Sequence, residues 1–257
     1  MRSALRLLAT GWWFQLKMRS RSAFDGILGV IYPMFFATSV LLMYRQAGSE
    51  EALINAAVGA SMLGVWSAVA TTAAISLQAE RRQGTLELLV AAPTPFTLLL
   101  VPMTLAMATI GLYSLVATLL WGRFAFGIPI SLEDPLVFVL AAVVTAIAVS
   151  LMGFLLAVCS VRYRGSWALG SGLEFPIWLI CGFLVPLALL PGWVRPIAWA
   201  LPPTWGVAAV KDAAFGGSPW LDIVTCLALS LGYAAVGTVI ARRLVDSARA
   251  NATLALT

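Results

Sequence analysis

Long apolar stretches separated by short polar segments run through most of the chain. Six of these stretches are candidates for membrane spans: Phe24–Tyr44, Leu53–Leu77, Phe96–Trp121, Pro135–Ser160, Leu169–Leu190 and Leu221–Leu244. About 20 apolar residues of α-helix cross the hydrocarbon core of a bilayer. The pattern therefore predicts an all-α integral membrane protein. We expect a bundle of six transmembrane helices over residues 24–244, preceded by a segment at 1–23 and followed by a cytoplasmic tail at 245–257.

The composition indicates that lipid is the solvent of this chain. Hydrophobic residues make up 61% of the 257 residues and charged residues only 11%, whereas soluble domains have about 45–50% apolar and about 25% charged residues. A chain of this length has no means of hiding so much apolar surface in water. We therefore expect residues 1–257 to form a single transmembrane domain.

The segment before the first predicted span has the pattern of a helix that lies on the membrane surface. Apolar residues recur close to helical spacing within Leu5–Met18, at Leu5, Leu8, Trp12 and Leu16. Arg2, Arg6 and Lys17 supply basic groups, and tryptophan suits the headgroup level. We expect an amino-terminal interfacial helix within residues 1–23. The alternative is a short lead-in without regular structure.

Basic residues are distributed unevenly over the two sides of the predicted bundle. If both termini are cytoplasmic, all but four of the 16 Lys and Arg residues lie on the cytoplasmic side. Those four are Arg45, Arg123, Arg195 and Lys211. Because cytoplasmic loops are enriched in Lys and Arg, this distribution predicts cytoplasmic termini in an inner or plasma membrane. The basic residues are dispersed over four segments, which argues against nucleic acid as a partner.

The sequence contains few residues or motifs that could catalyse a reaction or bind a metal or a nucleotide. It contains no histidine, and its three cysteines, Cys159, Cys181 and Cys226, lie in apolar stretches without C-x-x-C spacing. No stretch matches the phosphate-binding pattern G-x-x-x-x-G-K-[ST]. We therefore expect no metal site, no catalytic residues and no cofactor bound by this chain. A membrane-embedded enzyme is disfavoured, and any ATPase that drives this protein must be another chain.

The most informative polar segment follows the second predicted span, at Gln78–Pro93. It combines charged residues with an apolar edge formed by Leu86, Leu89 and Val90. Gly84 permits a bend, and Thr85 can cap the helical turn after it. Pro93 ends the segment before the third span. A charged, bent element at the cytoplasmic surface is suited to docking on a soluble partner.

A second unusual segment, residues 191–217, lies between the last two predicted spans. Prolines interrupt it at Pro191, Pro196, Pro202 and Pro203, yet it is rich in tryptophan. The segment is too apolar for an ordinary loop and too broken for a span. Non-helical backbone at membrane depth must be covered by protein or line a wet cavity, which favours short re-entrant helices. The alternative is an aromatic belt at the outer interface.

These two segments carry a resemblance to a known family. Glu80-x-x-x-Gly84-Thr85-Leu86-Glu87, followed by two leucines and Pro93, resembles the coupling segment of the type-2 ATP-binding-cassette (ABC) permeases. In the outer segment, Leu201–Trp205, Ala208–Asp212 and Gly216-Gly217 resemble the Asn-Pro, Arg-Asp and Gly pattern of the same family. Pro202 stands where the family often has Asn, and Lys211 where it often has Arg. These features and the six predicted spans, taken in order, extend over nearly the whole chain.

The resemblance implies the permease subunit of an ABC exporter for an amphiphilic drug, lipid or glycan. Two such subunits, identical or related, would form the pathway at their interface and pair with two copies of an ABC ATPase that binds ATP and Mg²⁺. The ATPase-docking residues would be Glu80, Arg81, Arg82, Gly84, Thr85, Leu86, Glu87 and Pro93. The outer gate, built from re-entrant helices, would contain Trp199, Pro202, Pro203, Trp205, Lys211 and Asp212.

The alternative function is an ion-coupled secondary carrier or channel. Such proteins need ionisable ligands well inside their spans, and this chain has few there. Asp25 lies at the start of the first span and Glu174 one to two turns into the fifth. Two interpretations of Glu174 stay open. Either it lines the cytoplasmic mouth of the pathway and contacts a cationic substrate, or it pairs with Arg162 or Arg164.

Overall fold

The computed structural model describes residues 2–21, 23–46, 50–84, 96–128, 132–160 and 166–251. In this part of the chain all regular structure is helical, as the apolar pattern predicts. The helices are α1 (Arg2–Ser20), α2 (Ala23–Gln46), α3 (Glu50–Arg82), α5 (Thr97–Phe126), α6 (Pro135–Ser160), α7 (Ser166–Ile180), α8 (Arg195–Ala200), α9 (Pro202–Phe215) and α10 (Trp220–Asn251), with a 3₁₀ turn, η1, at Leu187–Leu189.

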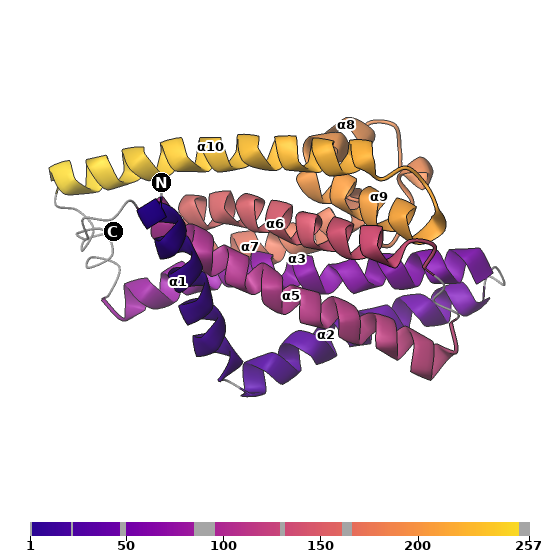
Figure 1. The fold of residues 1–257 in the computed structure, drawn as a ribbon. Helices are drawn as coiled ribbons and strands as arrows, with labels where there is room; N and C mark the ends of the chain where they lie inside the picture. Colours follow the sequence, from indigo (N-terminus) through magenta and orange to yellow (C-terminus); the bar gives the residue numbers. More distant parts are fainter. Residues whose placement is uncertain are drawn as a thin grey trace.

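The long helices form a bundle with α3 near its centre (Figure 1). α3 packs against α2, α5, α6, α7 and α9, whereas α10 contacts α6 and α9 at the edge. In the apolar window of α3, 78% of the residues are buried inside the protein, compared with 22% in that of α10. The core accordingly centres on α3, with Trp66 fully buried. α10 leaves most of its apolar surface facing outward, as a lipid-exposed helix does.

Glycines allow the neighbours of α3 to approach it closely. A side-chain carbon added at Gly59 would overlap the carbonyl oxygen of Phe183, and one added at Gly64 would overlap Ser114 on α5. Small residues at such positions let neighbouring segments approach a helix closely. Gly172 on α7 differs from them, since nothing lies within 4 Å of a side-chain carbon added there.

Four of the described helices are long and apolar enough to cross a membrane. They contain Leu53–Ala70 in α3, Thr97–Phe126, Pro135–Cys159 and Trp220–Ser247. α2 supplies a shorter apolar stretch, Val30–Arg45. α7 is only 15 residues long. The chain is therefore a multi-pass membrane protein, and the count of six spans stays a prediction.

The fifth predicted span, Leu169–Leu190, does not form one continuous helix. α7 ends at Ile180. Gly182 follows with a left-handed φ of 78°, a conformation that ends helices and that glycine adopts without strain. Pro186 lacks the N–H needed to continue a helix and precedes η1. Hydrophobicity alone extends this span too far, because Phe183 and Leu184 are apolar residues of a buried turn rather than of a helix.

The amino-terminal helix α1 runs across the bundle rather than along it (Figure 1). It packs on α5, where Gly11 lies against Pro102 and the indole N–H of Trp12 donates a hydrogen bond of 3.1 Å to the hydroxyl of Thr109. Trp13 and Phe14 are exposed on its outward side. The predicted helix is confirmed, and its position at the membrane surface stays a prediction.

Candidate functional site

The first candidate region is the end of α3 that carries the predicted docking residues. α3 continues beyond Leu77, the predicted end of the second span, so Glu80, Arg81 and Arg82 lie in its last turns. Gly84 follows with a left-handed φ of 69° and nothing within 4 Å of an added side-chain carbon. Gly84 therefore has a backbone conformation that ends the helix and permits a bend. The remaining docking residues, Thr85, Leu86, Glu87 and Pro93, lie outside the described residues.

Figure 1 shows the start of α1 and the end of α10 at one end of the bundle, with α8 and α9 at the other. α3 runs between these two ends as one helix of 33 residues. The described start of the predicted docking segment, at the end of α3, and the predicted outer gate are thus at opposite ends of the bundle. α3 connects them directly, since it also packs against α9.

Four of the six residues of the predicted outer gate, Trp199, Pro202, Pro203 and Trp205, lie at the corner between α8 and α9. Pro202 and Pro203 occupy the first turn of α9, where the missing N–H of proline costs no helical hydrogen bond, and both are buried. The indole N–H of Trp205 donates to the carbonyl oxygen of Trp199 at 2.8 Å. The hydroxyl of Thr204 donates to the carbonyl oxygen of Ala198 at 2.6 Å. Side chains of α9 thereby satisfy carbonyl groups at the end of α8.

Lys211 and Asp212 lie further along α9 and contact other parts of this end. The amine of Lys211 donates a hydrogen bond of 2.8 Å to the carbonyl oxygen of Gly182, in the turn that ends α7. Burial lowers the pKa of this amine from 10.5 to about 8. Asp212 accepts a backbone hydrogen bond of 2.7 Å from Gly217, which closes α9. The six predicted gate residues therefore divide between the α8–α9 corner and the later turns of α9.

An aromatic seam joins α2 and α7, formed by Tyr32, Phe36, Phe175 and Trp178. The ring of Trp178 is 5.0 Å from that of Phe36 and 5.0 Å from that of Phe175, both edge-on, and 6.5 Å from that of Tyr32. These residues do not belong to either of the two motifs recognised in the sequence. Their spacing could have revealed them: Tyr32 and Phe36 are four residues apart on α2, and Phe175 and Trp178 are three apart on α7. This spacing puts each pair on one face of its helix.

Glu174 lies next to this seam in sequence and on the side of α7 that faces α3. Only 3% of its surface is exposed, and it accepts a hydrogen bond from the hydroxyl of Ser67 on α3. Its predicted partners Arg162 and Arg164 lie outside the described residues. A buried carboxylate thus sits in the contact between the central helix and α7, one residue before the aromatic ring of Phe175.

The side chains of the described ranges include no group of three His, Cys, Asp or Glu residues able to hold a metal ion. The fold and its sites define a class: a multi-pass helical membrane protein whose polar features lie at the two bundle ends and beside an aromatic seam.

The family follows from comparison with known proteins. The family model described as ABC-2 type transporter matches residues 6–215, and the chain belongs to this family. The resemblance seen in the two motifs is therefore confirmed. None of the curated proteins compared with the chain matches it. Membrane domains of this family are transport permeases, are not catalytic themselves and generally work with an ABC ATPase partner.

Proposed function

We propose that the chain is the membrane subunit of an ABC exporter and forms half of a translocation pathway for an amphiphilic drug, lipid or glycan. The family match over residues 6–215 carries this proposal. Two permease subunits, either identical or related, pair with two copies of an ABC ATPase that binds ATP and Mg²⁺. Both termini lie in the cytoplasm, and the protein resides in the inner or plasma membrane.

The proposed pathway runs along the face that carries the α2–α7 aromatic seam. Phe35 and Phe175 are 67% and 53% exposed there, so this face has aromatic surface available for a second subunit or a substrate. Aromatic rings accept both apolar groups and cations. Glu174, buried beside the seam, adds a polar carboxyl group. An amphiphile with a positive group fits these features better than a fully apolar molecule does.

The proposed drive is movement of the docking segment, residues 80–93, when the ATPase binds and hydrolyses ATP. α3 is one helix of 33 residues, about 50 Å long at 1.5 Å per residue. A tilt imposed at Arg82 therefore moves Ser67, which holds Glu174, and moves Gly59, which contacts the turn after α7. ATP binding shifts the equilibrium to the extent that the partner binds the two conformations with different affinity.

The proposed outer gate is the α8–α9 corner. Trp199 is 52% exposed and can meet its counterpart across a subunit interface. Apolar side chains can separate there without leaving unpaired polar groups. Pro202 and Pro203 restrict the backbone of the corner, so that it keeps its shape while the subunits move.

The alternative, an ion-coupled carrier, draws on the buried carboxylate of Glu174. Copurification separates the two functions. An ABC permease is isolated together with a soluble ATPase that carries the phosphate-binding loop, and an ion-coupled carrier is not.

The docking proposal is tested by reversing both acids of the motif, Glu80→Lys with Glu87→Lys, and isolating the membrane complex. We expect the yield of ATPase-bound permease to fall by about tenfold or more, because reversed charges at a docking surface oppose their former partners. ATP hydrolysis stimulated by the permease should fall in parallel.

Asp246→Lys is the matched control, because Asp246 is an exposed acid near the end of α10, at the same end of the bundle. This variant should keep the bound ATPase. If the double variant retains the ATPase and its hydrolysis as well as the control does, the docking segment lies elsewhere.

A further inference from the structure

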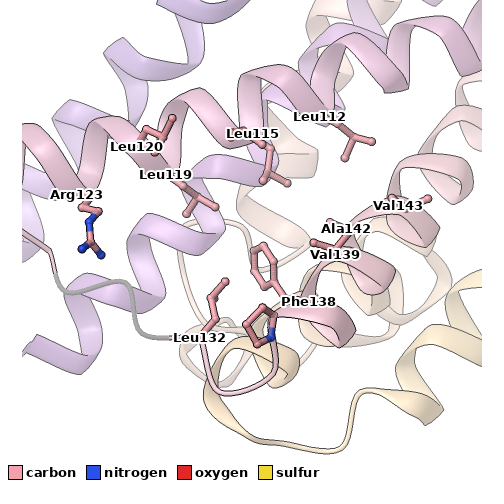
Figure 2. A pocket seen from close by; sticks show the side chains of 12 residues that line it. Leu112, Leu115, Leu119, Leu120, Arg123, Leu132, Phe138, Val139, Ala142 and Val143 are labelled. Atoms are coloured by element: carbon pink, nitrogen blue, oxygen red, sulfur yellow. The ribbon is translucent and has the colours of Figure 1, made fainter.

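An apolar groove of about 410 Å³ lies between α5 and α6 (Figure 2). Leu112, Leu115 and Leu119 form its α5 side, and Phe138 and Ala142 belong to its α6 side. Its volume is within the range of about 300–1,000 Å³ that is typical of small-molecule sites. None of its lining residues belongs to the α2–α7 seam or to the α8–α9 corner, and the proposed function does not use it.

The length and position of the groove match one leaflet of a bilayer. It extends along α5 from Leu112 to Arg123, about 16 Å at 1.5 Å per residue. The hydrocarbon core of a bilayer is about 30 Å thick, so the groove spans roughly half of it. Leu112 lies near the middle of α5, which runs from Thr97 to Phe126. The groove thus reaches from the end of the helix to its centre, as one acyl chain does from headgroup to midplane.

The shallow end of the groove carries its single charged lining residue, Arg123. Figure 2 shows the guanidinium of Arg123 at one end, with Leu112 and Val143 at the other. Arg123 is exposed in the last turn of α5. Guanidinium binds phosphate oxygens through two parallel hydrogen bonds. One cationic group at headgroup depth, followed by an apolar trough, complements the phosphate and acyl chain of a phospholipid.

Two acids adjoin lining residues of the groove in sequence. Asp134 precedes Pro135, a lining residue, and its carboxylate accepts a hydrogen bond of 3.3 Å from the backbone N–H of Val137. It therefore caps the start of α6, where a negative charge is favourable. Glu133 follows the lining residue Leu132, and its carboxylate lies against Gly216 at the end of α9. Arg123 is thus the charged side chain that lines the groove itself.

We propose that the α5–α6 groove is a binding site for a membrane phospholipid, with one acyl chain along the groove and its phosphate on Arg123. The occupant comes from the leaflet that faces the α8–α9 end of the bundle. Lipids on convex helix surfaces exchange freely, whereas a concave trough with a cation at one end retains one molecule. The bound chain fills the space between α5 and α6 and supports their spacing.

The test uses the full chain in liposomes that contain a phosphatidylcholine with a photoreactive diazirine on one acyl chain. After illumination, the labelled peptides are mapped by mass spectrometry. We expect groove residues of α5 and α6 to be labelled several-fold more than the exposed face of α10. Arg123→Gln should lower groove labelling by about tenfold, since it removes a charge-assisted contact. A diazirine diacylglycerol, which lacks the phosphate, should label the groove weakly and independently of Arg123.

Two matched variants control for general effects. Arg45→Gln removes an exposed arginine at the same end of the bundle, outside the groove, and should leave labelling unchanged. Val139→Trp blocks the groove and should abolish its labelling, whereas Val224→Trp, equally near the start of α10, should not. Equal labelling of the groove and of α10, or labelling that persists in Val139→Trp, would show surface lipid only and overturn the proposal. Cross-linking of Val139→Cys to a second copy, with no lipid label in the groove, would overturn it in favour of a subunit contact.

Discussion

At the scale of single residues, the contact between α3 and its neighbours depends on the absence of side chains. Gly59 faces the carbonyl oxygen of Phe183 so closely that no side-chain carbon fits between them. The same turn is also held by Lys211, through its hydrogen bond to Gly182, and the Lys211 side chain lies beside Gly59. These two contacts fix the point where α7 ends against α3 and α9. In the proposed mechanism, a displacement of α3 would reach the predicted outer gate through them.

Gly59→Ala should destabilise the protein, because the added methyl overlaps a backbone atom that cannot rotate away. We expect a loss of about 3 kcal/mol, and a melting temperature in detergent that is about 5–10 °C lower. Gly172→Ala is the matched control, since it is also a helical glycine but faces open space. That variant should melt at the original temperature or slightly above it. Equal melting temperatures for the two variants would contradict the close contact at Gly59.

At the scale of elements, the region after α7 differs most from what hydrophobicity predicts. The apolar sequence continues to Leu190, yet the helix ends at Ile180 and the chain continues through a turn, η1, α8 and α9. α9 then packs against α3, α6 and α10. The two short helices expected within 191–217 are present, and their re-entrant position in a membrane stays a prediction.

A disulfide between two subunits tests whether the α8–α9 corner gates the pathway. Trp199→Cys should cross-link across the interface on oxidation and stop transport, because the joined corners can no longer separate. Reduction should restore transport. Trp220→Cys, an equally exposed position at the start of α10, should neither cross-link nor alter transport. A Trp199→Cys protein that cross-links and still transports would show that the corner does not gate, and one that never cross-links would place α8 away from the interface.

At the scale of the whole molecule, the bundle has two chemically different ends. One carries the start of α1, the end of α3 and the end of α10, with basic residues such as Arg82, Arg242 and Arg243. The other carries the α8–α9 corner and acids such as Glu133, Asp212 and Asp222. Figure 1 shows the start of α1 and the end of α10 at the opposite end from α8 and α9. By the positive-inside rule the basic end is expected to be cytoplasmic, and this orientation stays a prediction.

Cysteine labelling in intact cells tests this orientation. Ser3→Cys and Ala250→Cys should react with a membrane-impermeant maleimide only after the cells are opened. Ser218→Cys, in the exposed connection between α9 and α10, should react in intact cells. The reverse pattern, with the termini labelled from outside, would contradict cytoplasmic termini and place the docking segment on the wrong side for an ATPase.

The sequence by itself determined the class, the family and most of the helices. Burial in lipid requires long apolar helices, so Pro135–Ser160 is predicted with the bounds that α6 has. The two motifs at 80–93 and 201–217 carried the resemblance to the family whose model matches residues 6–215. Apolar runs and short motifs are formed by residues that lie close together in the sequence. They can therefore be recognised without knowledge of the tertiary structure.

Tertiary structure alone decided how the helices meet. The early end of α7, the aromatic seam and the α5–α6 groove all depend on which apolar side chains face protein and which face lipid. The sequence does not distinguish those two environments, because both favour the same residues. Glu174 shows the consequence: its partner Ser67 is 107 residues away, and only the packing of α7 on α3 brings the two together.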